Sequence, residues 1–287
     1  MRRWLITGAG GMLGRDLTGR LTAEGEQVTG FTRTHLDVTD ASSVAAAVKR
    51  LKPDVVVNCA AWTAVDDAQA RENEALNVNG RAVGYLAEAC ADNHAALVQI
   101  STDYVFDGQA EKPYQEDHPA APRSAYGRTK LAGEEAARAA LPHNAYVVRT
   151  AWLYGAHGSS FVATMLARAR AGSPVSVVDD QRGQPTWTGD VARQIHAMIA
   201  AGARADTYHA TSSGDTTWFG LAREVYALAG ADPALVTPTT SAAYQRPAPR
   251  PAYSVLGHDA WLAAGIKPIG DWQDALGRAF PAMLATP

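Results

Sequence analysis

Tyr126 and Lys130 have the residue types and the spacing of a proton-transfer pair. Residues four apart lie on one face of a helix, and the helix predicted over 124–139 contains both. The pKa of a free phenol is about 10, but a neighbouring ammonium group favours the phenolate and lowers that pKa. Thr102, at the end of a predicted strand, would present its hydroxyl to a carbonyl oxygen beside Tyr126. The three side chains together predict acid–base chemistry at a carbonyl group.

A glycine-rich loop directly follows the first predicted strand, with the sequence Thr7-Gly8-Ala9-Gly10-Gly11-Met12-Leu13-Gly14. Gly8 would permit the tight turn, Gly11 the close approach of the backbone to a pyrophosphate, and Gly14 the close packing of helix on strand. The N-terminus of the next helix offers unpaired N–H groups to the anion. The loop therefore predicts a dinucleotide-binding site.

Arg33 lies where NAD-specific sites usually carry an acidic residue, about 20 positions after the glycine loop. Its guanidinium group suits a 2′-phosphate better than a bare ribose, so we predict NADPH as the cofactor, with NADH as the alternative. A solvated surface position is the other interpretation of Arg33. Asp37 is placed to accept a hydrogen bond from the adenine amino group, whereas Thr39 or Asp40 would cap the next helix.

Alternating strands and helices must position these groups, and the sequence indicates them. Strands are predicted at 3–7, 27–31, 54–59, 95–100 and 145–149, with continuous apolar runs typical of strands buried on both faces. Helical patterns lie at 11–24, 41–51, 72–92 and 124–139. This order predicts an α/β fold with a Rossmann-type, doubly wound parallel sheet, whose ligands collect at the carboxyl ends of the strands.

Beyond residue 154 the pattern is less regular. Helices are predicted near 159–171, 189–201, 217–229 and 271–284, and short strands near 174–178 and 206–210. We expect a dinucleotide-binding domain over 1–155 that takes back parts of about 174–215, and a smaller substrate-binding domain over most of 156–287. The proline-rich stretch at 233–251 indicates either an ordered loop over a cleft or a flexible linker.

The composition is that of a globular protein: 47% of the 287 residues are hydrophobic and 19% are charged. A net charge of −3 provides no electrostatic footprint for nucleic acid or an anionic membrane, so neither is expected as a partner. Cys59 and Cys90 are too few for a disulfide framework or a four-thiolate zinc site. The N-terminal apolar run is too short for a signal peptide, and no run reaches the length of a membrane span, so we expect a cytoplasmic protein.

The glycine loop and the Tyr126-x-x-x-Lys130 pair resemble the extended short-chain dehydrogenase/reductase superfamily. More narrowly, the segments 36–40, 58–66, 101–108, 149–155 and 180–186 are similar to the dTDP-4-dehydrorhamnose reductase family. The resemblance covers nearly the whole chain. The octet Ser-Thr-Asp-Tyr-Val-Phe-Asp-Gly at 101–108 is its most specific part, because generic members of the superfamily lack it.

The resemblance implies reduction of the C4 ketone of dTDP-6-deoxy-L-lyxo-4-hexulose to dTDP-L-rhamnose, with NADPH or NADH. Tyr126 would donate the proton to the C4 alkoxide, Lys130 would hold the nicotinamide ribose and lower the pKa of Tyr126, and Thr102 would bind the carbonyl oxygen. The positions matched to the cofactor are Gly8, Gly11, Met12, Leu13 and Gly14 at the pyrophosphate, Asp37 and Val38 at the adenine, and Ala60, Ala61 and Thr63 at the nicotinamide side. Those matched to the substrate are Asp103, Tyr104 and Trp152 at the sugar and Arg250 at the diphosphate. An exposed loop arginine is the alternative interpretation of Arg250.

The sequence departs from some relatives at a metal position. These relatives dimerise through magnesium held by glutamates, one of them just after the segment at 180–186. Here the residues 187–190, Trp-Thr-Gly-Asp, contain no glutamate. We therefore expect no metal site, and either a monomer or a homodimer.

Four alternative functions remain open. A sugar-nucleotide dehydratase would use an Asp-Glu pair after the threonine, but here Asp103 and Tyr104 follow Thr102. An epimerase is disfavoured only by the family resemblance. A 4-ketoreductase of another dTDP-deoxysugar pathway, such as dihydrostreptose formation, would share every motif. A non-catalytic binding subunit, like the regulatory subunit of methionine adenosyltransferase, is disfavoured because Thr102, Tyr126 and Lys130 are all present.

Overall fold

Six short strands form a parallel sheet at the centre of the fold. The computed structural model describes residues 1–285. The strands are β1 (Arg3–Thr7), β2 (Gln27–Phe31), β3 (Val55–Asn58), β4 (Ala96–Thr102), β5 (Ala145–Thr150) and β10 (Thr207–His209). They lie in the order β10-β5-β4-β3-β1-β2, and every pair is parallel. This arrangement confirms the predicted doubly wound sheet.

The burial of the strands follows their place in the sheet. β3, β4 and β5 are buried along their whole length, as their continuous apolar runs predict. In β2, Gln27 and Gly30 are exposed and the other residues are half-buried. The prediction of burial on both faces is therefore wrong for β2, which lies at one edge of the sheet, whereas β10 at the other edge is buried along its whole length.

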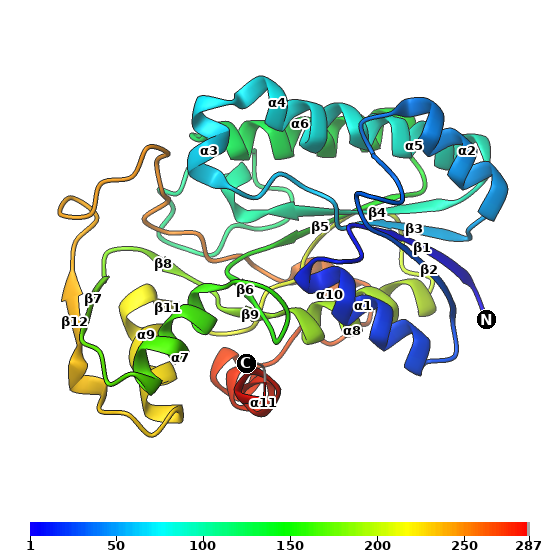
Figure 1. Cartoon of the computed structure of the whole chain (residues 1–287). Coiled ribbons are helices and arrows are strands. Elements are labelled where there is room, and N and C mark those ends of the chain that lie inside the picture. The colour runs from blue at the N-terminus through cyan, green and yellow to red at the C-terminus, as the bar shows by residue number, and fades with distance from the viewer. Residues whose placement is uncertain (286–287) are drawn as a thin grey trace.

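Helices cover both faces of the sheet (Figure 1). One face carries α1 (Met12–Ala23), α8 (Thr188–Ala200) and α10 (Asp259–Ala263). The other carries α2 (Ala41–Leu51), α3 (Val65–Ala70), α4 (Glu72–Leu76), α5 (Ala82–Asp92) and α6 (Ala125–Ala140). The single helix predicted over 72–92 is interrupted, since a π-helical turn at Asn77–Arg81 separates α4 from α5.

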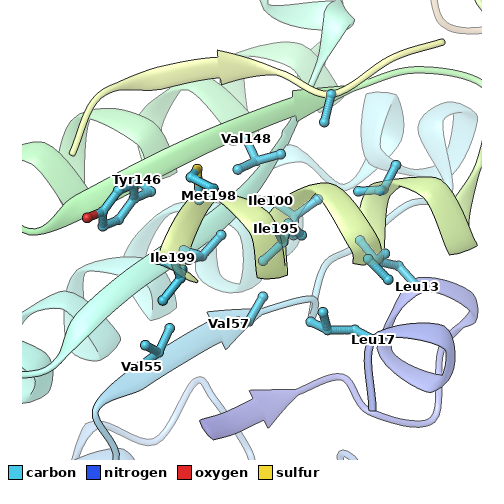
Figure 2. Packing of buried hydrophobic residues seen from close by; sticks show 14 of the residues in the cluster. Leu13, Leu17, Val55, Val57, Ile100, Tyr146, Val148, Ile195, Met198 and Ile199 are labelled. Atoms are coloured by element: carbon cyan, nitrogen blue, oxygen red, sulfur yellow. The ribbon is translucent and has the colours of Figure 1, made fainter. Parts of the chain in front are cut away.

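The core between α1, α8 and the sheet is purely apolar. Figure 2 shows side chains of the two helices, among them Leu17 and Ile195, packed with Val57 and Ile100 of the sheet. Leu17, Val57 and Ile195 have no exposed surface. Because α8 comes from the second half of the chain, this packing ties residues 188–200 to the strands formed by the first half.

A second group of elements packs beside the carboxyl ends of the strands (Figure 1). Its helices are α7 (Phe161–Arg170), α9 (Trp218–Leu228) and α11 (Trp272–Leu284). Its short strands are β6 (Leu153–Tyr154), β7 (Val175–Val178), β8 (Arg182–Gly183), β9 (Thr186–Trp187), β11 (Thr216–Thr217) and β12 (Val236–Thr239). These elements share a third apolar cluster around Leu221, Tyr226 and Phe280.

The proline-rich stretch is ordered rather than a flexible linker. It begins with a 3-10 turn at Pro233–Leu235 and continues as β12, which pairs in parallel with β7. The residues that follow lie along a cavity, as described below. Among the described residues, none of the helices combines the length and the apolarity needed to cross a bilayer.

We expect Ile195→Ala to lower the free energy of unfolding by about 2 to 5 kcal/mol, because it leaves a cavity between α8 and the sheet. Urea denaturation measures this loss. Leu262, on α10, is 63% exposed, and Leu262→Ala serves as the control, with an expected change within about 0.5 kcal/mol. Equal losses in the two variants would contradict the packing described here.

Candidate active site

The carboxyl ends of β1, β3 and β4 open into a cavity of about 590 Å³. This position is the one that an open parallel sheet favours for ligands, because the strand order reverses there and leaves a crevice. Most of the site residues predicted from the sequence line this cavity: Gly8, Gly11, Met12, Leu13, Gly14, Ala61, Thr63, Thr102, Asp103, Tyr104, Tyr126, Lys130 and Trp152. Segments more than a hundred residues apart in the chain therefore meet in one place.

The start of α6 positions Tyr126 beside the end of β4. The Ser124 hydroxyl caps the helix by accepting a hydrogen bond from the Gly127 backbone N–H at 3.1 Å. A Cβ at Gly127 would lie only 2.1 Å from the Tyr104 carbonyl oxygen, so glycine is required for α6 to approach the chain this closely. The Tyr104 and Tyr126 rings meet edge to face, with centroids 5.6 Å apart. The phenol of Tyr126 thereby shares the cavity with Thr102.

Burial keeps the phenol of Tyr126 protonated. It raises the pKa of Tyr126 above that of a free phenol, the charge of Asp103 raises it further, and the Thr102 hydroxyl lowers it in part. Lys130 is not among the groups that shift this pKa within the described chain. The predicted lowering of the pKa of Tyr126 by Lys130 therefore stays a prediction.

Lys130 is directed towards β4 instead. Its ammonium group donates a hydrogen bond of 2.6 Å to the Ile100 carbonyl oxygen, and only 3% of the residue is exposed. Burial lowers the pKa of Lys130 to about 8, against the attraction of the Glu134 carboxylate. This hydrogen bond holds the ammonium group of Lys130 at the end of β4.

Asp103 contributes a buried carboxyl group next to Thr102. It is 2% exposed, and its Oδ1 accepts a hydrogen bond from the Thr102 hydroxyl at 2.9 Å. Its Oδ2 has no hydrogen-bond partner within residues 1–285. Burial raises the pKa of Asp103 to about 6, so this carboxyl group titrates close to neutral pH.

The glycine loop fits a dinucleotide. Gly8 has a φ of +64°, and a Cβ there would lie 2.6 Å from the Ala60 backbone nitrogen. A Cβ at Gly14 would lie 2.4 Å from the Gly8 carbonyl oxygen, so the loop can fold this tightly only with glycine at both positions. No side chain of the described residues caps the N-terminus of α1. Its first N–H groups are therefore open to a pyrophosphate.

Four residues predicted to bind the cofactor lie outside this cavity: Arg33, Asp37, Val38 and Ala60. Asp37 accepts hydrogen bonds at its Oδ1 from the Thr39 backbone N–H at 2.9 Å and from the Thr39 hydroxyl at 2.7 Å. Val38 is buried in the core under α2, and the backbone of Ala60 packs against Gly8. Their adenine and nicotinamide contacts stay predictions.

The end of β2 has its own small cavity. Exposed Arg33 lines this space of about 380 Å³ together with Thr39 and Trp62. The charge of Arg33 contributes to the lowered pKa of Asp37, after the hydrogen bonds from Thr39. Asp40, rather than Thr39, caps α2 by accepting hydrogen bonds from two backbone N–H groups.

A larger cavity of about 910 Å³ adjoins the site and shares Tyr104 and Trp218 with it. Arg250 lines this cavity and binds the Asp66 carboxylate at 3.0 Å. The sequence analysis missed Trp218 and Arg168, which also face this cavity. Neither belongs to a motif, so only the folding of α7, α9 and β12 around one space could reveal them.

Trp152 forms the boundary between the two cavities with Trp218. The two indole rings stack with centroids 3.5 Å apart and planes within 7° of parallel. Trp152 has a φ of +47°, a strained conformation for a residue with a side chain. Its ring lies over Gly183, where a Cβ would come within 2.6 Å. The glycine in the segment at 180–186 therefore makes room for this indole.

The chain was compared with known proteins. The family model described as RmlD substrate binding domain matches residues 1–284. A dTDP-4-dehydrorhamnose reductase of Streptomyces griseus is 54% identical over 98% of this chain and 94% of its own length. The chain belongs to the dTDP-4-dehydrorhamnose reductase family. This confirms the resemblance inferred from the motifs.

Two further members of the family bear on the chemistry. A protein of Streptomyces antibioticus, described as a probable dTDP-4,6-dihydroxy-2-methyloxan-3-one 4-ketoreductase, is 55% identical over 99% of this chain and 96% of its own length. The crystal structure of a dTDP-4-dehydrorhamnose reductase from Bacillus anthracis, in complex with NADP, has a TM-score of 0.94 and 34% identity. It covers 98% of this chain and 99% of its own.

The acidic side chains at and beside the segment 187–190, where no metal site is expected, are engaged with other side chains. Asp190 is fully buried and binds Arg278 through both oxygens, at 2.9 and 2.5 Å. Asp16 accepts a hydrogen bond from the Thr188 hydroxyl at 2.5 Å. Within residues 1–285, no group of three or more His, Cys, Asp or Glu residues is arranged to hold a metal ion.

The raised pKa of Asp103 predicts a pH-dependent stability. A raised carboxyl pKa means that folding disfavours the charged form, so the stability contributed by Asp103 falls as the pH rises through about 6. Asp103→Asn removes this charge and should raise Tm more at pH 8 than at pH 5. Thermal unfolding at the two pH values measures the difference.

Asp107→Asn is the matched control, because hydrogen bonds from the Tyr114 hydroxyl and the Gln109 backbone lower the pKa of Asp107. Its loss should decrease Tm, and more at pH 8 than at low pH. A pH-independent effect of Asp103→Asn would show that the carboxyl group titrates normally.

Proposed function

We propose that this protein uses NADPH to reduce the C4 ketone of dTDP-4-dehydro-6-deoxy-L-mannose, giving dTDP-L-rhamnose. One observation carries this proposal. In a member of the reductase family, Thr102, Tyr126 and Lys130 line the same cavity as the glycine loop. NADH remains the alternative cofactor.

NADPH supplies the hydride when it is bound. Tyr126 donates its phenolic proton to the ketone oxygen as that oxygen gains negative charge, and the phenol is protonated and ready because burial raises its pKa. The Thr102 hydroxyl turns from Asp103 to the same oxygen and stabilises the developing charge. Lys130 donates one of its three N–H groups to the Ile100 carbonyl oxygen, which leaves two that can bind the nicotinamide ribose.

The loop residues Gly8, Gly11, Met12, Leu13 and Gly14 would hold the pyrophosphate, and Ala60, Ala61 and Thr63 the nicotinamide side. Asp37 and Val38 would contact the adenine. The fit of the loop supports these assignments, because the backbone turns tightly there and leaves the N–H groups of α1 open to an anion. The NADP complex of the Bacillus anthracis relative supports the choice of cofactor.

The substrate would extend from the reacting cavity into the larger one beside it. Asp103, Tyr104 and Trp152 would contact the sugar, since all three line the reacting cavity. The larger cavity carries Arg168 and Arg250, whose guanidinium groups suit a nucleoside diphosphate. This division supports a dinucleotide-binding domain over 1–155, with residues of 174–215 returned to it, and a substrate domain over most of 156–287.

A 4-ketoreductase acting on a different dTDP-deoxysugar is the second candidate. The Streptomyces antibioticus relative favours it, because that protein is as similar to this chain as the Streptomyces griseus reductase is. A cytoplasmic location, a dTDP-sugar substrate without a nucleic-acid or membrane partner, and a monomeric or homodimeric state complete the proposal.

A coupled assay tests the reaction. The purified protein is supplied with dTDP-4-keto-6-deoxyglucose, the corresponding 3,5-epimerase and NADPH, and the sugar product is identified. We expect epimerase-dependent NADPH oxidation and dTDP-L-rhamnose. Reduction to a different sugar would favour the second candidate. No oxidation with any dTDP-4-keto-6-deoxyhexose, together with specific capture of a protein partner, would indicate a binding subunit.

Tyr126→Phe should lower kcat by about 100-fold or more, because it removes only the proton donor. The affinity for NADPH, measured by fluorescence titration, should stay within about twofold of the wild type. Turnover close to that of the wild type would remove the phenol from the acid role.

Arg33→Ala should raise the KM for NADPH by about tenfold or more and change the KM for NADH little, because only NADPH carries the 2′-phosphate. Arg50, at the end of α2, is exposed, and Arg50→Ala is the control for loss of a surface charge. Equal effects of Arg33→Ala on the two cofactors would refute the assignment.

A further inference from the structure

A third charged residue follows Tyr126 and Lys130 on the same face of α6. Glu134 comes four residues after Lys130, as Lys130 does after Tyr126. Its side chain is completely buried. The sequence analysis did not single out this glutamate, because a carboxylate one turn beyond the catalytic pair is usually a solvated helix residue.

Both oxygens of the Glu134 carboxylate accept hydrogen bonds in the protein interior. Its Oε1 accepts hydrogen bonds from the Ser101 hydroxyl at 2.5 Å and from Arg149 Nε at 2.9 Å. Its Oε2 accepts from Arg149 Nη2 at 2.8 Å and from Arg138 Nη2 at 3.2 Å. Four hydrogen bonds thus join one carboxylate to α6, β4 and β5.

These partners are immediate neighbours of the proposed reacting groups. Ser101 lies in β4 between Ile100, whose carbonyl oxygen binds Lys130, and Thr102. Arg149 lies opposite Ser101 on β5. The carboxylate therefore connects the helix that carries Tyr126 and Lys130 with the strand that carries Thr102, at the level of the site.

Glu134 contributes one negative charge to a junction that holds the buried cations Lys130 and Arg149. Besides Tyr126 and Glu134 on its own helix, the titratable and charged groups around Lys130 are Cys59 after β3, Asp103 after β4 and Arg149 on β5. Burial raises the pKa of Cys59 to about 12, so this thiol is neutral. Glu134 is the anion that raises the pKa of Lys130 against the effect of burial.

Arg149 is itself fixed in the interior, with 4% of the residue exposed. It donates to the Glu116 carbonyl oxygen at 3.3 Å and lies 5.0 Å from the Phe106 ring centroid. Beside it, His209 is neutral, because burial and the charge of Arg149 hold its pKa well below the usual value. His209 therefore adds no positive charge beside Arg149.

We propose that Glu134 is a positioning residue for this site. It holds α6 against β4 so that Tyr126 and Lys130 meet Thr102, and it supplies the negative charge that balances Lys130. An ion pair serving stability alone would need only Arg149, and apolar residues would often serve as well. The additional bond to Ser101, next to Thr102, is what links Glu134 to the chemistry. This inference rests on the function proposed above.

Glu134→Gln tests the charge while it keeps the length of the side chain. Without the carboxylate, Lys130 should lose its proton at a lower pH, because Arg149 is then an unbalanced cation nearby. NADPH affinity, measured by fluorescence from pH 6 to pH 9, should fall with rising pH in the wild type. In Glu134→Gln this fall should occur about one pH unit lower, and kcat should be reduced about tenfold or more.

Three variants make the test specific. Lys130→Met should abolish this pH dependence of NADPH binding. The double variant Glu134→Gln/Arg149→Met removes both charges. The pH at which NADPH affinity falls should then return part of the way to the wild-type value. Glu72→Gln is the matched control, since Glu72 also pairs with an arginine of α6, Arg128 at 2.7 Å, but at the surface. It should leave both kcat and the pH dependence unchanged.

Wild-type kcat and wild-type pH dependence in Glu134→Gln would overturn the inference. Should this variant fail to fold, Glu134→Asp decides. This variant keeps the negative charge but shortens the side chain that reaches Ser101. The kcat should therefore fall about fivefold or more, while the pH dependence of NADPH binding stays unchanged. An unchanged kcat would overturn the inference. NADPH binding is titrated without substrate. Its pH dependence therefore tests the role of Glu134 independently of whether the protein catalyses the proposed reduction.

Discussion

The burial of one ammonium group, on Lys130, is the constraint on which the rest of the site depends. An ammonium group inside a protein must be hydrogen-bonded and balanced by charge, because its transfer from water is otherwise too costly. The Ile100 carbonyl oxygen meets the first requirement, and Glu134 meets the second. Both require α6 to lie close to β4. That closeness brings Tyr126, one turn before Lys130, to the end of the strand beside Thr102.

Burial shifts the pKa values of the acids and of the base in this site in opposite directions. It raises the pKa of Tyr126 and Asp103 and lowers that of Lys130, because in each case the charged form is disfavoured. A protonated phenol is the form that donates a proton to a reduced ketone. The low polarity of the cavity therefore keeps the phenol in the protonated form that the proposed reduction needs.

The two adjoining cavities are built from different parts of the chain. The glycine loop and the Thr102, Tyr126 and Lys130 side chains line the smaller cavity. The larger one is built from α7, β7, α9 and the chain after β12, and meets the smaller at Tyr104 and Trp218. Relatives described with different dTDP-sugars are 54 and 55% identical to this chain.

The sequence by itself determined the elements of the sheet and the motifs that follow them. Continuous apolar runs predicted the central strands, and local spacing predicted the glycine loop and the Tyr126–Lys130 pair, because each of these signals lies within a few neighbouring residues. Three features depend on contacts between distant residues, so only the tertiary structure decided them. These are the exposure of β2 at the sheet edge, the stacking of Trp152 on Trp218, and the upward shift in the pKa of Tyr126. Glu134 is the clearest example. Its spacing is visible in the sequence, but its burial and its contacts with Ser101 and Arg149 arise only when β4 and β5 pack beneath α6. Burial matters because a charge interacts more strongly with its neighbours in the protein interior than in water.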